Sequence, residues 1–181
     1  MTLPLLLRLT NNSNWYCYGQ NLYAVADGVV VKAMDGIPDN VPLATKRAAP
    51  ITLDTICGNF VLIDIGAGSY ALYAHMIPDS VRVNVGDKVR AGQVIGLLGN
   101  SGNSDAPHLH FHISTTPNKL ILASEGLPYE IDSFEVEGKR LFLLGDLDDI
   151  RKLTFKPKRG EKPKKLHNEM PIRYYVYSFP M

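Results

Sequence analysis

The chain has 181 residues, of which 45% are hydrophobic and 20% charged, and these ordinary globular proportions exclude a disordered chain. No stretch approaches the roughly 20 consecutive apolar residues of a membrane-spanning helix. We therefore expect no membrane span. The formal net charge is only +1, and we expect no nucleic-acid partner, while the oligomeric state stays open.

The N-terminal stretch MTLPLLLRLTNNSNW is a poor secretory signal, because its apolar part is short, contains Pro4 and has no basic start. Residues 22–26 and 29–34 are rich in β-formers and flank Asp27–Gly28, a pair that favours a tight hairpin turn. Residues 60–65 and 70–74 read as a second strand pair around the sequence Gly-Ala-Gly.

Short apolar alternations with Gly turns continue through residues 81–98, and residues 99–107 (GNSGNSDAP) contain no large apolar side chain. We expect this segment to be a flexible rim. Residues 108–114 alternate as a strand, and residues 174–179 (YYVYSF) favour a final strand. No segment before residue 115 has a helical period.

The fold class expected is therefore all-β and antiparallel, a sandwich-like barrel with irregular C-terminal additions. A strip over residues 151–165 carries eight basic residues and one acidic residue. It could meet a phosphate-rich polymer, although a solvated loop is the simpler interpretation. We predict a β domain over residues 1–145, with a basic loop and C-terminal strand over residues 146–181 packed on it.

Three of the five histidines lie in one segment, PHLHFHI. On a strand, His108, His110 and His112 would share one face, with neighbouring imidazoles about 7 Å apart and the outer two about 13 Å apart. Neighbours at this spacing can converge on one metal ion or one substrate atom, whereas the outer two cannot share an ion. His75 follows the apolar strand YALYA and could join the same site, while His167 lies in the basic tail.

The series AVADGVV, GNFVLIDIG, YALYAHM and VNVGDKVRAGQVIGLLGNSGNSDAPHLHF resembles the LytM/lysostaphin-type zinc metallopeptidases of peptidase family M23, over about residues 15–135. The resemblance implies an antiparallel β domain built on a duplicated hybrid motif. It also implies a zinc metalloendopeptidase, a hydrolase that cleaves peptide cross-links in bacterial peptidoglycan in the cell wall, in the periplasm or outside the cell. The half-barrels of lipoyl, biotinyl and phosphotransferase carriers are a more distant resemblance.

The same resemblance implies roles for individual residues. His108 corresponds to a catalytic histidine that positions or deprotonates the attacking water, and His75 to its catalytic partner, which steadies the oxyanion. His110 corresponds to a zinc ligand, and the zinc polarises the scissile carbonyl. Substrate-binding residues are unknown. His112 stands where the family usually has an acidic or amide residue.

The family takes two further zinc ligands, a His and an Asp four residues later, from a segment before AVADG, but residues 1–26 contain no His, Asp or Glu. One imidazole cannot hold zinc tightly, so we expect weak or absent zinc binding and little hydrolysis. Cys17 or His112 could substitute as a ligand. The chain is either a truncated endopeptidase or a non-catalytic module that binds peptidoglycan or regulates another enzyme, and an in-frame H-x-x-x-D upstream of Met1 would favour truncation.

Overall fold

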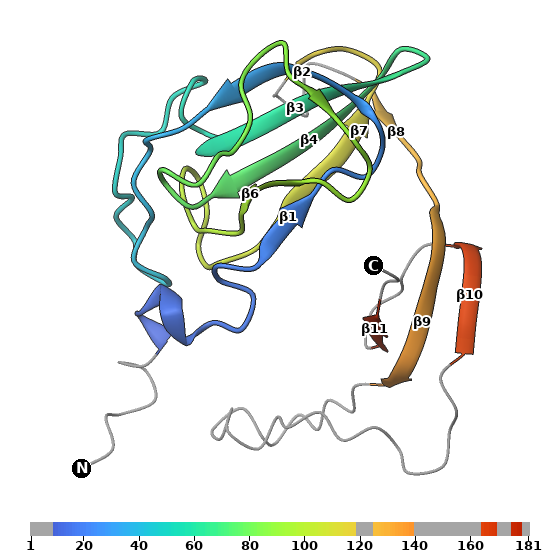
Figure 1. The fold of residues 1–181 in the computed structure, drawn as a ribbon. Helices are drawn as coiled ribbons and strands as arrows, with labels where there is room; N and C mark the ends of the chain where they lie inside the picture. The colour runs from blue at the N-terminus through green and yellow to red at the C-terminus, as the bar shows by residue number, and fades with distance from the viewer. Residues whose placement is uncertain (1–8, 119–124, 140–163, 170–174, 179–181) are drawn as a thin grey trace. The chain divides into compact units, whose positions relative to one another are not determined.

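The computed structural model describes residues 9–118, 125–139, 164–169 and 175–178, and its strands are labelled in Figure 1. The chain divides into two compact units, residues 1–127 and residues 128–181. Regular structure in the described ranges is almost entirely β-strand, and no helix there has the length and apolar character needed to cross a bilayer. The all-β, antiparallel class predicted from the sequence is confirmed.

The described part of the first unit includes a single turn of 3₁₀ helix, η1 (Asn12–Asn14), which is capped by the side chain of Asn11. Its longest strands, β3 and β4, have eight residues each and form a hairpin around residues 67–68. This hairpin confirms the second predicted strand pair. The strands are β1 (Asn21–Tyr23), β2 (Gly28–Met34), β3 (Asn59–Gly66), β4 (Ser69–Met76), β5 (Lys88–Val89), β6 (Val94–Leu97), β7 (His110–Ser114) and β8 (Gly126–Leu127).

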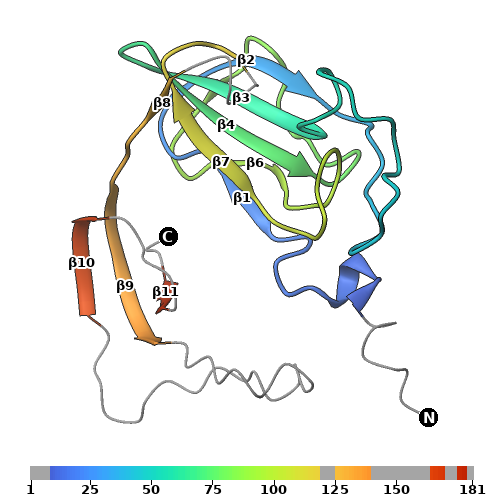
Figure 2. The same cartoon turned by 180° about the vertical axis from the view of Figure 1, so that it is seen from behind.

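Six of these strands form one antiparallel sheet in the order β5-β2-β3-β4-β7-β8, and β1 pairs with β6 in a second, smaller sheet. Figure 2 shows the large sheet from behind, with β7 beside β4. The register pairs Ala74 of β4 with His110 of β7. This pairing places the end of β4, where His75 lies, next to the start of β7.

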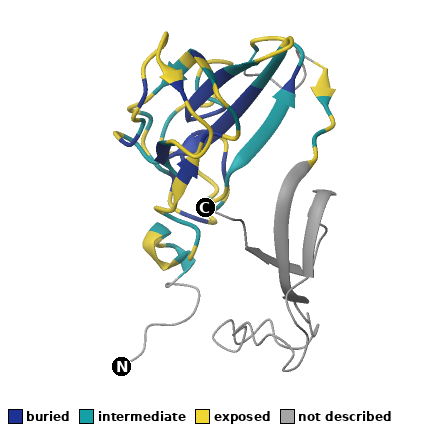
Figure 3. Ribbon diagram, turned by 45° about the vertical axis from the view of Figure 1, so that its right-hand side comes forward, coloured by how far each residue is buried: buried dark blue, intermediate teal, exposed yellow. Residues whose placement is uncertain are grey.

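Both faces of the large sheet are buried at its centre, in β3 and β4 (Figure 3). Val61 and Ile63 point into one apolar cluster, whereas Phe60 and Leu62 point into another. Successive strand residues face opposite sides, so the continuous apolar run FVLI is what a strand covered on both faces requires. β3 and β4 therefore form the buried centre of the large sheet.

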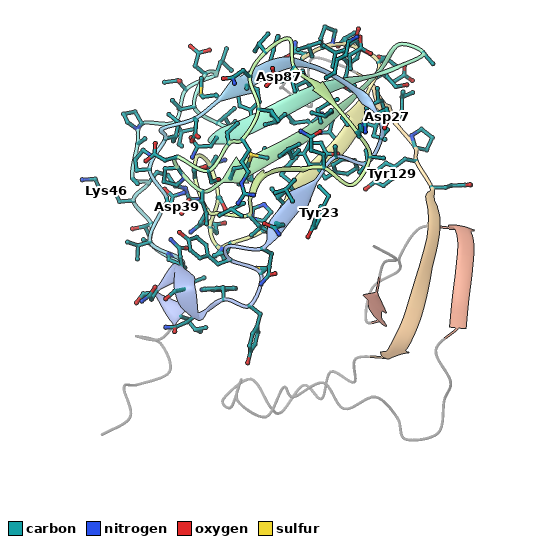
Figure 4. The ribbon with its side chains drawn as sticks, viewed as in Figure 1. Tyr23, Asp27, Asp39, Lys46, Asp87 and Tyr129 are labelled. Atoms are coloured by element: carbon teal, nitrogen blue, oxygen red, sulfur yellow. The ribbon has the colours of Figure 1, made fainter. Side chains whose placement is uncertain are left out.

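The hairpin predicted around Asp27–Gly28 is wrong, because β1 pairs with β6 and β2 pairs with β3 and β5. The carboxylate of Asp27, labelled in Figure 4, accepts the backbone N–H of Ala91 at 2.8 Å. Gly28 lies so close to β3 that a Cβ there would collide with the carbonyl oxygen of Asp64. Asp27 lies in the bend that carries the chain from the small sheet to the large one, and Gly28 begins β2.

The flexible rim predicted over residues 99–107 is also wrong, because Asn100, Ser101 and Ser104 are buried. The buried amide of Asn40 donates to the carbonyls of Asn100 and Gly102 at 2.8 Å each and to that of Ser104 at 3.1 Å. A polar loop can be buried when its backbone groups find partners. This loop is a packed support for the histidines beside it.

The second unit contains an antiparallel sheet with the strand order β10-β9-β11 in its described residues. Its last strand agrees with the strand expected over residues 174–179. The domain boundary predicted after residue 145 and the basic strip up to residue 163 lie outside the described residues. The strands are β9 (Ile131–Lys139), β10 (Lys164–Glu169) and β11 (Tyr175–Ser178).

Candidate active site

His75 occupies the buried end of β4 in an unusual backbone conformation, with a φ of 65°. Its N–H donates to the carbonyl of Cys57 at 2.9 Å, and its carbonyl accepts the N–H of Gly99 at 3.0 Å. These two bonds hold a backbone geometry that a residue with a Cβ rarely adopts. The φ value turns the residue away from the ordinary path of the strand.

The His75 ring is fixed through Nδ1, which lies 2.8 Å from the carbonyl oxygen of Ser101. Because a carbonyl oxygen can only accept, Nδ1 of the neutral ring carries the proton and Nε2 carries the lone pair. Ser101 belongs to the buried loop described above, and its hydroxyl donates to the carbonyl of Met76 at 2.7 Å. The loop thus sets both the orientation and the tautomer of His75.

His108 is exposed and lies just before β7, which begins at His110 rather than at His108 as expected. Its Nδ1 lies 2.8 Å from the carbonyl of Ala106 and 3.2 Å from the hydroxyl of Ser104. The same reasoning therefore leaves the lone pair of His108 on Nε2. The hydroxyl of Ser104 also donates to the amide oxygen of Asn100 at 2.6 Å, so this ring too is supported by the buried loop.

The structure brings together the rings predicted to form the site. The ring centroid of His75 lies 4.9 Å from that of His108 and 5.7 Å from that of His110. The ring of His112 lies 5.5 Å from that of His110. The rings converge because the end of β4, at His75, lies next to the start of β7, at His110. Strand alternation within β7 would not by itself bring His75 to the other rings.

Burial lowers the pKa of His75, His110 and His112, and desolvation is the main cause because a charged imidazolium loses its hydration inside the protein. It lowers the pKa of His75 from 6.5 to about 4, and the neighbouring imidazoles lower it further. Burial also lowers the pKa of His110 and of His112, each with a smaller contribution from one adjacent histidine. These three rings are neutral at physiological pH.

Replacement of His75 by Asn, a residue that tolerates positive φ, is expected to make the free energy of unfolding less dependent on pH in the acidic range. Between pH 6.5 and about 4 the unfolded chain binds a proton at His75 that the folded chain does not, so stability falls as the pH falls. Wild type should lose about 3 kcal/mol more than H75N over this interval. Urea unfolding at both pH values measures the difference, and equal losses would contradict a buried, neutral His75.

Sequence reasoning missed the residues that support the imidazoles. The carbonyls of Ser101 and Ala106 fix two rings, and the amide of Asn40 donates to the carbonyl of Asn100 in the same loop. Asp39, labelled in Figure 4, accepts the hydroxyl of Tyr18 at 2.7 Å and the N–H of Asn100 at 2.8 Å. The Asn/Ser-rich composition of the loop was the available signal, and it was interpreted as flexibility.

The donor set does not meet the requirement of a catalytic zinc ion, which takes three protein ligands. Within the described ranges, no group of three or more His, Cys, Asp or Glu side chains is arranged to hold a metal ion. The thiol of Cys17 donates to the carbonyl of Pro107 at 3.1 Å, and burial raises its pKa. Cys17 is therefore held as a thiol, which binds metal poorly.

The fold and the site together define an antiparallel β domain with a cluster of imidazoles where the end of β4 meets the start of β7. The model of peptidase family M23 matches residues 15–121 of this chain. The match covers more than half of the sequence, so the chain belongs to this family.

Curated relatives match shorter segments. Glycyl-glycine endopeptidase ALE-1 of Staphylococcus capitis is 42% identical over 57 residues, 32% of this chain and 15% of that protein. Peptidoglycan DD-endopeptidase ShyA of Vibrio cholerae is 35% identical over 95 residues, 52% of this chain and 17% of that protein. Murein hydrolase activator EnvC of Escherichia coli is 43% identical over 56 residues, 31% of this chain and 13% of that protein. The chain therefore matches less than a fifth of each of these relatives.

Solved structures include the catalytic domain of lysostaphin from Staphylococcus simulans. It is 26% identical with a TM-score of 0.42, and the match covers 60% of this chain and 68% of that one. A mutant catalytic domain of the prophage-encoded M23 protein EnpA from Enterococcus faecalis is 29% identical with a TM-score of 0.40, covering 54% of this chain and 60% of that one.

Proposed function

We propose that the histidine cluster is part of a site for peptide-bond hydrolysis in bacterial peptidoglycan, with His75 and His108 as the catalytic pair and His110 as one metal ligand of a set that is incomplete in these 181 residues. The observation that carries this proposal is the 4.9 Å separation of the His75 and His108 rings. Each of these rings has its Nδ1 on a backbone carbonyl and its lone pair on Nε2. Membership of family M23 and the activities named for ALE-1 and ShyA support the reaction and the substrate class.

His108 is suited to the role of general base. Its Nδ1–H already donates to Ala106, so a proton taken from the attacking water enters at Nε2. The resulting imidazolium keeps its contact with the Ala106 carbonyl, and a hydrogen bond between charged and neutral groups is stronger than one between neutral groups. His108 is exposed, which allows water and a peptide to reach it.

His75 acts first as an acceptor in this scheme, because its neutral Nε2 has a lone pair and no hydrogen. It can orient the attacking water by accepting one of its hydrogens. Donation to an oxyanion requires a second proton on the ring, and the second hydrogen of the attacking water can supply it after His108 has taken the first. The buried Ser101 carbonyl keeps the ring in place for either step.

A polypeptide of these 181 residues is expected to bind little zinc and to hydrolyse little peptidoglycan, because His110 is its one counterpart of the family's zinc ligands. After dialysis against micromolar zinc, metal analysis should find far less than one equivalent. Cleavage of peptidoglycan or of a pentaglycine peptide should not exceed that of an H108A control. One equivalent of zinc, together with cleavage that is lost in H110A, would contradict the expectation.

A second candidate is a non-catalytic module that binds peptidoglycan or regulates another wall enzyme. It is favoured by the incomplete donor set and by the similarity to the murein hydrolase activator EnvC. Co-sedimentation with purified peptidoglycan, followed by addition of the protein to a separate wall hydrolase, tests this candidate. Binding or stimulation that survives in H108A would favour the module over the enzyme.

A further inference from the structure

Ser104 connects the exposed ring of His108 to the interior of the supporting loop. The residue is only 1% exposed. Its Oγ lies 2.6 Å from the amide oxygen of Asn100, 2.9 Å from the carbonyl oxygen of Ala106 and 3.2 Å from Nδ1 of His108. A hydroxyl has a single hydrogen, so the direction of that hydrogen decides what the ring of His108 meets.

The buried side chain of Asn100 fixes this direction. Its amide nitrogen lies 3.1 Å from the carbonyl oxygen of Asn40 and 3.1 Å from the amide oxygen of Asn12. Because both of these oxygens are acceptors, the nitrogen of Asn100 faces them with its two hydrogens, and its oxygen faces Ser104. Two oxygens 2.6 Å apart need a hydrogen between them, and only the hydroxyl of Ser104 can supply it.

The oxygen of Ser104 therefore turns a lone pair toward His108, and Nδ1 of the ring has to be the donor. The same N–H is shared with the carbonyl of Ala106, at 2.8 Å, as a three-centre hydrogen bond. Each donor in this series has an acceptor, from the ring of His108 through Ser104 and Asn100 to the backbone of Asn40. The proton on Nδ1 leaves the lone pair of the ring on Nε2.

We propose that Ser104 is a positioning residue for His108, whose hydroxyl oxygen accepts the Nδ1–H of the ring and so keeps Nε2 as the atom that takes up a proton. This inference rests on the proposed role of His108 as general base. The carbonyl of Ala106 belongs to the same short segment as the ring, whereas Ser104 is tied through Asn100 to the backbone of Asn40. A partner on one ring nitrogen determines which nitrogen remains available for chemistry.

The arrangement suits proton uptake at Nε2. Once the ring is charged, its Nδ1–H becomes a charged donor, and hydrogen bonds from charged donors are the stronger ones. The hydrogen of Ser104 points away, toward Asn100, so the hydroxyl presents the negative end of its dipole to the imidazolium. Both acceptors of the N–H, the hydroxyl and the carbonyl of Ala106, are neutral groups.

Two-bond proton–nitrogen correlation spectra of the labelled, metal-free protein at mildly alkaline pH test the proposal, because they distinguish protonated from lone-pair ring nitrogens. In wild type, His108 is expected to be predominantly the Nδ1–H tautomer, whereas free histidine favours Nε2–H. In S104A the ratio of Nδ1–H to Nε2–H should fall about fivefold, as expected for the loss of one ordinary hydrogen bond. S104T keeps the hydroxyl and should keep the wild-type ratio.

S114A is the matched control. It removes another buried hydroxyl, which donates to the carbonyl of Thr116 at 3.0 Å and not to a histidine, so a purely structural loss should leave the tautomer of His108 unchanged. If S104A does not fold, S104C gives the same comparison, because a thiol fills the space but accepts weakly. Its ratio should fall as well.

An unchanged ratio in folded S104A or S104C would overturn the proposal and leave His108 held by Ala106 alone, with the catalytic pair intact. A predominant Nε2–H tautomer in wild type would overturn it without any variant. The spectra need neither zinc nor substrate. The proposed function fails in a different measurement, since an absence of contacts between the rings of His75 and His108 would refute the catalytic pair whatever Ser104 does.

Discussion

Replacement of Asn40 by Asp is expected to lower the free energy of unfolding by about 3–5 kcal/mol, the usual cost of an uncompensated buried charge. The side chain of Asn40 is almost completely buried, and its amide donates to the carbonyls of Asn100, Gly102 and Ser104. A carboxylate of the same shape has no hydrogen to donate, and it would face these carbonyl oxygens with a negative charge. The variant should therefore loosen the loop that holds the histidines.

Urea unfolding followed by the fluorescence of Trp15, the sole tryptophan, measures the change. Asn103→Asp is the matched control, because it adds the same charge at an exposed position of the loop to which Asn40 donates, and it should cost less than about 0.5 kcal/mol. The loss in N40D should diminish at acidic pH, where the protonated carboxyl regains one donor. Equal stabilities of N40D and N103D would contradict a buried, fully bonded Asn40.

Gly102→Ala is the second substitution with a large expected effect, again about 3–5 kcal/mol of unfolding free energy, from backbone strain together with overpacking. Gly102 has a φ of +74°, and a Cβ there would collide with the backbone nitrogen of Gly58 and lie 2.8 Å from the carbonyl oxygen of Ile56. These neighbours are backbone atoms, so they cannot move aside as a flexible side chain can.

Gly92→Ala separates strain from collision, since Gly92 has a similar φ of +79° and, beyond its chain neighbours, no heavy atom lies within 4 Å of the position that a Cβ would take. It should cost only the conformational penalty of about 1–2 kcal/mol. The same unfolding assay compares the two variants. If G102A and G92A were equally destabilised, the close approach of residues 58 and 102 would be refuted.

Local sequence signals were sufficient to predict the hairpin of β3 and β4 at the centre of the large sheet. The apolar run of β3, the Gly-rich turn and the β-formers of β4 all favour one hairpin, and the structure has that hairpin. The Asp27–Gly28 signal is equally local, but whether β1 pairs with β2 or with β6 depends on contacts distant in sequence. The carboxylate of Asp27 accepts the N–H of Ala91, 64 residues away. Rules that consider only the residues of a turn cannot predict such a contact.

The candidate site was partly predictable. The spacing of His108 and His110 and the position of His75 after a strand indicated one cluster, and the rings do meet. The positive φ of His75 could not be predicted, because it depends on the bonds to Cys57 and Gly99. The supporting loop was misinterpreted because the absence of large apolar residues excludes a hydrophobic core there but does not exclude burial of hydrogen-bonded polar groups.

The convergence of the imidazoles is the claim on which the proposed function depends, and ring-to-ring nuclear Overhauser effects in solution test it most directly. With centroids 4.9 and 5.7 Å apart, the ring protons of His75 are predicted to show cross-peaks to those of both His108 and His110. Loss of both sets of cross-peaks in H75N would assign them. A folded protein in which the assigned His75 ring shows contacts to neither histidine would contradict the account.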